Sequence, residues 1–428
     1  MFDLVIYGAT GFTGSYIVER LVTSSLFKDV KFAVAGRSES KLRKVLSDVS
    51  DKTGINIRST TIIVADTKDE QSLIDMAKQT KVVLNAVGPY RLHGEPVVKA
   101  AVENGASHVD ISGEPAFLEK MQEKYNETAK KNNVYIVGAC GWDSIPCDLG
   151  INFLKNNFNG DLNHAETFVQ LENGPEGYAI NAGTYQTLIL GISESAKDGL
   201  GAIRRKIMPV KTPRSTIKAP KRSAFWKIDH PEISGWALPF MGSDKSVVQR
   251  SQYFGYVLDQ DRPAQVETYL RISSLLWASL FTVWITIFFF LCQFKPTRQF
   301  LQKYPDLCSF NLFKNAGPTK AQMDGASFTY WLIGTGYSSK KSADEQHTDK
   351  PDRRVAAKCT GPDCGYYATS GCILSSALTL IKDRQSLPAD GGVYTTAAAF
   401  GKSKIYEYLS SFGVKFEVVS EKTLKNDH

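Results

Sequence analysis

Three glycines near the N-terminus have the spacing of a turn that binds a nucleotide diphosphate. Gly8, Gly11 and Gly14 form a GxxGxxG pattern between an apolar run and a helical repeat. In a strand–turn–helix unit the glycines allow a tight turn, a close pyrophosphate and close helix packing, and the free helix N–H groups favour phosphate. Thr10 and Phe12 lie in the same turn and belong to the expected site. The alternative is an ordinary strand–helix turn that only needs glycine.

The residues after the next apolar run indicate which dinucleotide would bind. A fold that selects NAD places Asp or Glu here, to hold the ribose 2′-hydroxyl. Arg37 and Ser38 occupy the position in this chain, and no acid lies between Ala35 and Ser38. Because a guanidinium and a hydroxyl suit a 2′-phosphate, we expect NADP(H) as cofactor, with NAD less favoured. A solvated basic start of a helix is the alternative.

Five polar side chains fall just after predicted strands, where ligands of parallel sheets bind. Asp66 is placed to touch the adenine side of a dinucleotide. The candidate proton donors are Tyr90, His93, Glu114 and Asp143. Structural alternatives exist, since Tyr90 could stack beneath the cofactor, Glu114 could start a helix and Asp143 could cap one.

The elements that must position these residues alternate regularly along the first 140 residues. Short apolar runs predict six strands, and amphipathic repeats between them predict helices. This alternation predicts a parallel sheet covered on both faces, an α/β doubly wound fold of the Rossmann type. The strands are expected at residues 2–7, 31–35, 61–66, 81–87, 108–112 and 134–138, with helices at 15–23, 94–105 and 114–132.

Length and composition limit the remaining possibilities. At 428 residues the chain is long enough for two domains. Its seven cysteines form no paired CxxC clusters, and Cys359 and Cys364 are separated by four residues with no nearby histidine. We therefore expect buried thiols in a reducing compartment and no metal site. An apolar strand beginning at Phe2 leaves no room for a signal peptide, so we expect the protein not to be secreted.

A basic stretch covers residues 199–228, which contain no Asp or Glu. Its prolines favour a loop or arm over a helix. Such a stretch suits anionic lipid headgroups or a nucleic-acid backbone, and a solvated loop is the third reading. It carries nine cations: Arg204, Arg205, Lys206, Lys211, Arg214, Lys218, Lys221, Arg222 and Lys227.

An apolar run of 23 residues from Ile272 to Phe294 contains no charge, Gly or Pro. At about 1.5 Å per residue it is just long enough for a hydrocarbon core of about 30 Å. If the end of the chain returns to the first domain, both flanks of the run lie on one side of a membrane. The run would then be a shallow hairpin or an interfacial helix in one leaflet. A buried helix of a soluble protein is the alternative.

Five ordered motifs show a resemblance to a known family. GATGFTG, AGRS, NAVGPYRLHGEPVVKA, DISGE and GWDSIPCDLG resemble the saccharopine dehydrogenase-like oxidoreductases. The resemblance implies an NAD(P)-binding Rossmann domain, a second α/β domain and a final segment that returns to the first. It also places Asn85 and Gly88 in a loop beneath the nicotinamide. For animal members of the family, the resemblance implies a location on lipid droplets. Some bacterial relatives resemble lipid enoyl reductases.

These observations together give the expected organisation and function. We expect a Rossmann domain at 1–148, a second α/β domain at 149–385 with the apolar membrane segment inserted, and a returning segment at 386–428. The expected activity is an NADP(H)-dependent oxidoreductase on a lipid droplet or the cytosolic face of a membrane, held by 272–294 and 204–227. Its substrate would be a lipid or lipid-linked molecule. Alternatives are a soluble amino-acid dehydrogenase of the saccharopine type or a non-catalytic NADP-binding scaffold on droplets. We expect no nucleic-acid partner and leave a homo-oligomer open.

Overall fold

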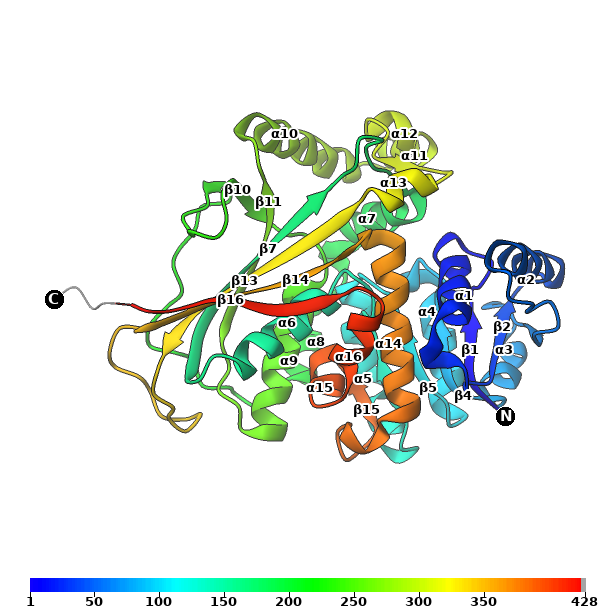
Figure 1. The fold of residues 1–428 in the computed structure, drawn as a ribbon, viewed down its shortest axis with the longest axis horizontal. Helices are drawn as coiled ribbons and strands as arrows, with labels where there is room; N and C mark the ends of the chain where they lie inside the picture. Colours follow the sequence, from blue (N-terminus) through cyan, green and yellow to red (C-terminus); the bar gives the residue numbers. More distant parts are fainter. Residues whose placement is uncertain (425–428) are drawn as a thin grey trace.

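A parallel seven-stranded sheet forms the N-terminal part of the computed structural model, which describes residues 1–424. Its order is β15-β6-β5-β4-β1-β2-β3, with β1 between β2 and β4. The apolar runs form buried strands because helices cover both faces. The doubly wound α/β fold expected from the sequence is thereby confirmed (Figure 1). The strands are β1 (Phe2–Tyr7), β2 (Phe32–Gly36), β3 (Ile62–Val64), β4 (Thr80–Asn85), β5 (Ser107–Asp110), β6 (Tyr135–Val137) and β15 (Gly392–Tyr394).

The helices of this domain follow the predicted pattern with one instructive difference. The helix expected at 94–105 begins earlier, at Tyr90, so Tyr90 and His93 lie in its first turn. The reason is a contact distant in sequence, because the Glu114 carboxylate accepts the backbone N–H groups of Tyr90 and Arg91. The helices are α1 (Phe12–Thr23), α2 (Glu39–Thr53), α3 (Glu70–Ala77), α4 (Tyr90–Glu103), α5 (Pro115–Lys131) and α6 (Ile145–Asn156), with the short turn η1 (Ser25–Phe27).

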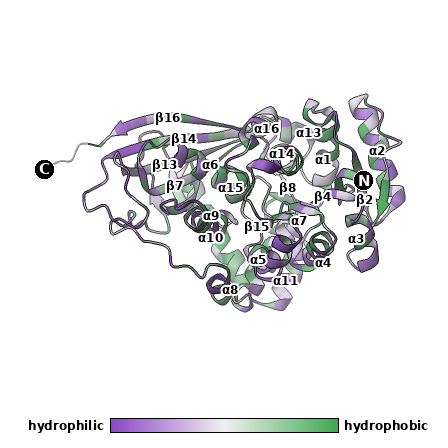
Figure 2. Cartoon of the chain, turned by 90° about the horizontal axis from the view of Figure 1, so that it is seen from below, coloured by the Kyte–Doolittle hydropathy of each residue, from purple (hydrophilic) through white to green (hydrophobic). Residues whose placement is uncertain are grey.

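The second domain is built on a mixed seven-stranded sheet of order β16-β14-β13-β7-β11-β10-β9. β7 and β11 are parallel and the other pairs are antiparallel. Figure 2 shows β16, β14, β13 and β7 in this order. The strands are β7 (Asp161–Glu172), β9 (Trp226–Lys227), β10 (Trp236–Pro239), β11 (Gln265–Ile272), β13 (Ser327–Tyr337), β14 (Arg353–Pro362) and β16 (Lys415–Thr423), and a separate two-stranded sheet joins β8 (Ile180–Asn181) to β12 (Phe313–Lys314).

The C-terminal part of the chain contacts both domains. The buried helix α14 (Thr369–Lys382) already packs on α1, β4 and β5 of the first domain, and β15 then pairs with β6. β16 leaves that domain again and pairs with β14 of the second sheet. In the segment expected to return to the Rossmann domain, residues 386–428, β15 thus joins the first sheet and β16 joins the second. The remaining elements here are η3 (Cys364–Ala368), η4 (Arg384–Ser386), α15 (Thr396–Phe400) and α16 (Ile405–Ser411).

The basic stretch 199–228 is not the simple loop expected from its prolines. It begins with helix α8 (Leu200–Ile207), where Arg204 and Lys206 pair with Glu119 and Glu123 on α5. Further along, Arg222 binds both Glu166 on β7 and Asp229. Burial would raise the pKa of Glu166, but hydrogen bonds from His230 and Arg222 lower it to about 2. Three of the nine cations of the stretch thus form ion pairs with carboxylates of the protein itself.

The apolar run forms one uninterrupted helix, α10 (Leu275–Cys292), so the hairpin is excluded. α10 lies at an edge of the molecule beside α11 (Lys295–Lys303) and α12 (Pro305–Cys308), at the top of Figure 1. Within residues 1–424, α10 and the segment Cys364–Lys382 are long and apolar enough to cross a membrane; most of α10 is exposed, whereas the second segment is mostly buried. The other helices of this domain are α7 (Ala182–Glu194), η2 (Ser195–Lys197), α9 (Asp244–Asp259) and α13 (Lys320–Asp324).

Candidate cofactor and active site

A cavity of about 210 Å³ opens at the carboxyl ends of β1, β2 and β4. This edge of a doubly wound sheet is where dinucleotides bind. Among the residues expected to bind the cofactor, Gly8, Thr10, Gly11, Arg37 and Gly88 line the cavity. The other lining residues are Tyr7, Gly36, Thr67, Ala86, Val87 and His93.

The glycine turn has the geometry that its spacing predicts. Gly8 has φ +92°, and a Cβ there would lie 2.7 Å from the Val87 side chain. A Cβ on Gly14 would overlap the carbonyl oxygen of Gly8, so the close packing of α1 on the turn requires glycine. Gly11 N–H donates to the Gly8 carbonyl at 2.9 Å, which closes the turn. The turn thus leaves bare backbone beside the cavity, as a pyrophosphate requires.

The other expected cofactor residues surround the cavity without lining it. Ser38 caps α2 by accepting the Lys41 N–H. Asp66 accepts the Lys68 N–H, and its charge acts on Tyr7 in the cavity wall. Asn85 is fully buried and accepts the Val87 N–H at 3.0 Å, so it shapes the loop after β4. Phe12 packs against Gly317 and Tyr366 of the second domain.

Tyr90 and Glu114 hold two loops together at the same edge of the sheet. The Tyr90 hydroxyl donates to the Asn85 carbonyl at 2.9 Å and accepts the Ile111 N–H at 3.2 Å. Burial raises the pKa of Tyr90 well above its usual range. Burial also raises the pKa of Glu114, although the N–H groups of Tyr90 and Arg91 favour its charged form. Both side chains therefore have structural partners that fix the start of α4.

His93 and Asp143 differ from those two candidates in their surroundings. His93 lies in the first turn of α4 and lines the cavity together with Gly88. Asp143 lies in the loop after β6, between Gly113 of the first domain and Gly242 of the second. The four proposed donors thus divide into a linked pair, a cavity residue and a residue between the domains.

Several residues at the site were not found from the sequence. Tyr7 and Thr67 line the cavity, and Asp198 pairs with Arg91 in the first turn of α4. Tyr7 ends a predicted strand, which is a usable signal, whereas Asp198 is 107 residues from its partner. Ser243 and Asp244 lie beside Asp143 and belong to the motif LPFMGSD.

The residues present fit a nicotinamide dinucleotide. Backbone around Gly8 and Gly11 faces the cavity where a diphosphate would lie, and Arg37 stands at the β2 end, where a ribose 2′-phosphate would lie. Within residues 1–424, no group of three or more His, Cys, Asp or Glu side chains is arranged to hold a metal ion. All seven cysteines are free thiols, and all but Cys308 are buried.

Comparisons with known proteins agree with this geometry. Residues 4–137 match the family model of the saccharopine dehydrogenase NADP-binding domain. The chain is 59% identical to a lipid droplet localized protein of Caenorhabditis elegans, over 98% of this chain and 99% of that protein. It is 40% identical to the saccharopine dehydrogenase-like oxidoreductase of Homo sapiens, over 98% and 97%.

A solved structure shares the fold at low sequence identity. The apo histidine-tagged saccharopine dehydrogenase (L-Glu forming) of Saccharomyces cerevisiae aligns with a TM-score of 0.52 over 98% of this chain and 100% of that one. The two sequences are 11% identical, so this likeness concerns the fold alone.

Proposed function

This chain belongs to the family of saccharopine dehydrogenase-like oxidoreductases, and from that premise we propose that it reduces a lipid or lipid-linked substrate at a droplet surface. It is an oxidoreductase with an NADP-binding domain. The observation that carries the proposal is the exposed apolar face of α10, which belongs to the same folded chain as the cofactor cavity.

One stripe of α10 consists of large apolar side chains that contact no other part of the fold closely. Trp277 is 65% exposed beside this stripe, whereas Ala278 is buried and Phe288 and Cys292 are buried in a cluster with α7. The stripe repeats every three or four residues, which places its members on one face of a helix. Its members, each about half exposed or more, are Leu276, Leu280, Val283, Ile287 and Phe290, and Phe294 continues the stripe just beyond the helix.

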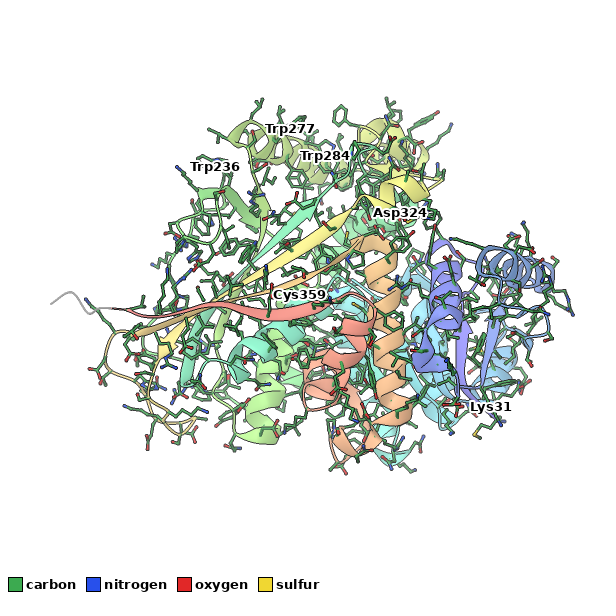
Figure 3. The ribbon with its side chains drawn as sticks, viewed as in Figure 1. Lys31, Trp236, Trp277, Trp284, Asp324 and Cys359 are labelled. Atoms are coloured by element: carbon green, nitrogen blue, oxygen red, sulfur yellow. The ribbon has the colours of Figure 1, made fainter. Side chains whose placement is uncertain are left out.

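The adjoining elements extend this surface. α11 and α12 expose Phe300, Tyr304 and Leu307, and Phe310 is 82% exposed just after α12. Phe310 and Asn311 both have positive φ, a conformation that costs energy for residues other than glycine. In Figure 3, Trp236, Trp277 and Trp284 gather at the same margin. Apolar patches of this kind mark membrane or protein contacts.

We infer that this surface enters one lipid leaflet and does not cross a bilayer. β11, which precedes α10, pairs with β7 and β10 of the second sheet. α11, which follows α10, packs against α7. Both flanks are therefore parts of one fold, which favours an interfacial helix. Lys295 and Lys303 are exposed beside the apolar side chains and suit anionic headgroups.

The basic stretch 204–227 supports the same contact only in part. Arg204, Lys206 and Arg222 pair with carboxylates of the protein. Among residues 1–424, no ion pair involves the other exposed cations of the stretch. Their contribution to lipid binding would be sensitive to salt, because exposed charges are screened. These cations are Arg205, Lys211, Arg214, Lys218, Lys221 and Lys227.

Arg37 is the residue that we propose selects NADPH over NADH. A charge-assisted contact of a guanidinium with a 2′-phosphate contributes about 1.5–3 kcal/mol. Arg37→Asp should therefore weaken NADPH binding by about 10- to 150-fold and reduce or invert the preference. Nucleotide titration by fluorescence measures both affinities. Equal affinity of the wild type for the two nucleotides would contradict this role.

The proposed function is tested by turnover on artificial droplets. Purified protein, NADPH and triolein droplets coated with phospholipid and a cellular lipid extract are incubated, and products are identified by mass spectrometry. Ile287→Lys should keep NADPH affinity but float with droplets about 30-fold less, since roughly 2 kcal/mol of apolar burial is lost. Val257→Lys, at an exposed valine of α9, is the matched control and should float normally.

Two results would contradict the proposal. One is NADPH oxidation with a water-soluble amino-diacid and none with lipid, which would favour a soluble enzyme of the saccharopine type. The other is equal flotation of Ile287→Lys and wild type, which would exclude α10 as the lipid-binding element.

A further inference from the structure

The Asp143 carboxyl group fits at the junction of the two domains because two residues that it contacts, Gly113 and Gly242, have no side chains. Its Oδ2 lies 2.6 Å from the position that a Cβ on Gly113 would occupy, and its Oδ1 lies closer still to that of Gly242. Gly113 follows β5 of the Rossmann sheet, and Gly242 directly precedes α9 of the second domain. The carboxyl group is therefore fixed at the carboxyl edge of the sheet, where substrates of such folds bind. Asp143 keeps some accessible surface.

A second carboxyl group, that of Asp244, lies behind Asp143. Asp244 is fully buried and accepts a hydrogen bond from the Tyr330 hydroxyl at Oδ2, while its Oδ1 has no hydrogen-bond partner among residues 1–424. Ser243, which directly precedes Asp244 in the chain, binds Asp143. Its N–H donates to Asp143 Oδ1 at 3.3 Å and its hydroxyl donates to the Asp143 carbonyl at 3.0 Å. The Ser243 hydroxyl also lies 2.8 Å from that of Ser144.

The surroundings of this pair oppose its ionisation. The groups that face it are Tyr330 from β13 and Cys147 and Asp148 from α6, and among residues 1–424 no ion pair involves Asp143 or Asp244. Burial raises the pKa of Asp143 to about 6, although hydrogen bonds from Ser243 favour the charged form. Burial and then the charge of Asp143 raise the pKa of Asp244 well above its usual range. The pair therefore retains a proton near neutral pH.

We propose that Asp143 is the catalytic proton donor of the reduction and that Ser243 and Asp244 are positioning residues that keep it supplied. This inference rests on the proposed function, since it requires a substrate that accepts a hydride. Of the four candidate donors, Asp143 then supplies the proton. Its partners Ser243 and Asp244 lie about one hundred residues away in the sequence.

The proposed reduction needs one hydride and one proton. When bound, the reduced nicotinamide would supply a hydride to the carbon of a polarised C=O or C=C bond, whose π electron pair would move to the oxygen or to the second carbon. The Asp143 carboxyl O–H bond breaks and its proton bonds to that atom, leaving a carboxylate. A proton from solvent then restores the pair, so each turnover consumes one NADPH and one proton.

Neighbouring candidates are less suited to this role. Both Glu114 oxygens accept backbone N–H groups at 2.7 and 2.9 Å, which favours the carboxylate over a donating acid. The Tyr90 proton is already donated to the Asn85 carbonyl. Asp143 accepts the Ser243 N–H at its side chain, touches two glycines and keeps some accessible surface, so a substrate atom can approach it.

The protonated carboxyl can be measured without any substrate. Infrared difference spectra of the NADP⁺-bound protein, recorded across pH 6, should show a carboxylic C=O component that shifts in D₂O, falls as the pH rises through about 6 and is absent in Asp143→Asn. Glu114→Gln is the comparison variant and should retain the band. A wild-type spectrum without a band assignable to Asp143 at pH 5 would overturn the proposal.

Turnover on the lipid-extract droplets gives the second measurement. Asp143→Asn should lower turnover by about 10²- to 10⁴-fold with unchanged NADPH affinity. Gly242→Ala should also lower turnover, because the new methyl group displaces the carboxyl group without removing it. Ser243→Ala should shift the pH profile without abolishing turnover. Wild-type-like rates in a folded Asp143→Asn overturn this inference alone, whereas an inactive wild type overturns the proposed function.

Discussion

Helices α10 and α14 are both apolar but have opposite environments. By length and composition α10 could cross a membrane, and so could the segment Cys364–Lys382, which contains α14. α14 lies between α1, β4 and α16, and twelve consecutive residues from Thr369 to Leu380 are buried. Only three residues of α10 are buried, and its outer stripe faces away from the protein. Figure 1 shows α14 in the middle of the molecule and α10 at its edge.

The two helices also differ in the size of their side chains. α14 contains Gly371 and several serines and threonines, whose small volume lets elements approach from all sides. Its hydroxyls bond back to the helix, as Ser376 does to the Cys372 carbonyl at 2.9 Å. α10 instead carries two tryptophans and four phenylalanines. A helix packed on every side favours small residues, whereas one that faces lipid accepts bulky ones.

The largest expected difference between the helices comes from a buried charge. Leu374→Lys in α14 places an unpaired ammonium at a fully buried position and should cost more than about 4 kcal/mol, enough to prevent folding. Ile287→Lys in α10 should leave the free energy of unfolding within about 0.5 kcal/mol of wild type. Urea denaturation followed by circular dichroism measures both. Unfolding of the α10 variant would mean that α10 is covered by protein.

A larger side chain should also destabilise α14 more than α10, but by less than a buried charge does. A Cβ on Gly371 would lie 2.6 Å from the Phe412 Cβ, so Gly371→Val should destabilise the fold by about 2 kcal/mol through overpacking. Ser279→Val, at an exposed position of α10, should change stability by less than about 0.5 kcal/mol. Thermal denaturation measures the loss of stability in both variants. Equal losses would contradict the difference expected between the two helices.

Removal of one hydroxyl should give the smallest effect. Thr286 is exposed on α10 and donates to the Thr282 carbonyl at 2.7 Å. Thr286→Val replaces a hydroxyl on the lipid side by a methyl group, which should strengthen droplet flotation by about 1 kcal/mol, or roughly fivefold. The buried counterpart in α14, Thr379→Val, should leave flotation unchanged. Weaker flotation of Thr286→Val would place residue 286 away from the lipid.

Short-range patterns predicted the parts of the protein that depend on neighbours in sequence. The GxxGxxG turn, its strand and its helix lie within 23 residues, and the cavity lies where the pattern places it. The start of α4 was misplaced because the group that fixes it, Glu114, is 24 residues away. Tyr330 and Asp244, separated by 86 residues, could not be paired from spacing alone.

The apolar segment that contains α10 shows the same limit. Hydropathy found the α10 run but not whether its flanks belong to one fold, and that depends on the pairing of β11 with β7 and β10. The helical start of the basic stretch, α8, was missed because its prolines come later and its position depends on Glu119 of the other domain.

The central claim, that the outer face of α10 enters a lipid leaflet, can be measured at a single residue. The natural cysteines are buried except for the half-buried Cys308, so an exposed cysteine introduced as Ile287→Cys can carry an environment-sensitive NBD label. On addition of phospholipid-coated triolein droplets, its emission should rise and shift to shorter wavelength, whereas NBD at Val257→Cys on α9 should not change. If the labelled proteins float with the droplets while the emission at residue 287 stays constant, α10 is not the lipid-contacting helix and the account is wrong.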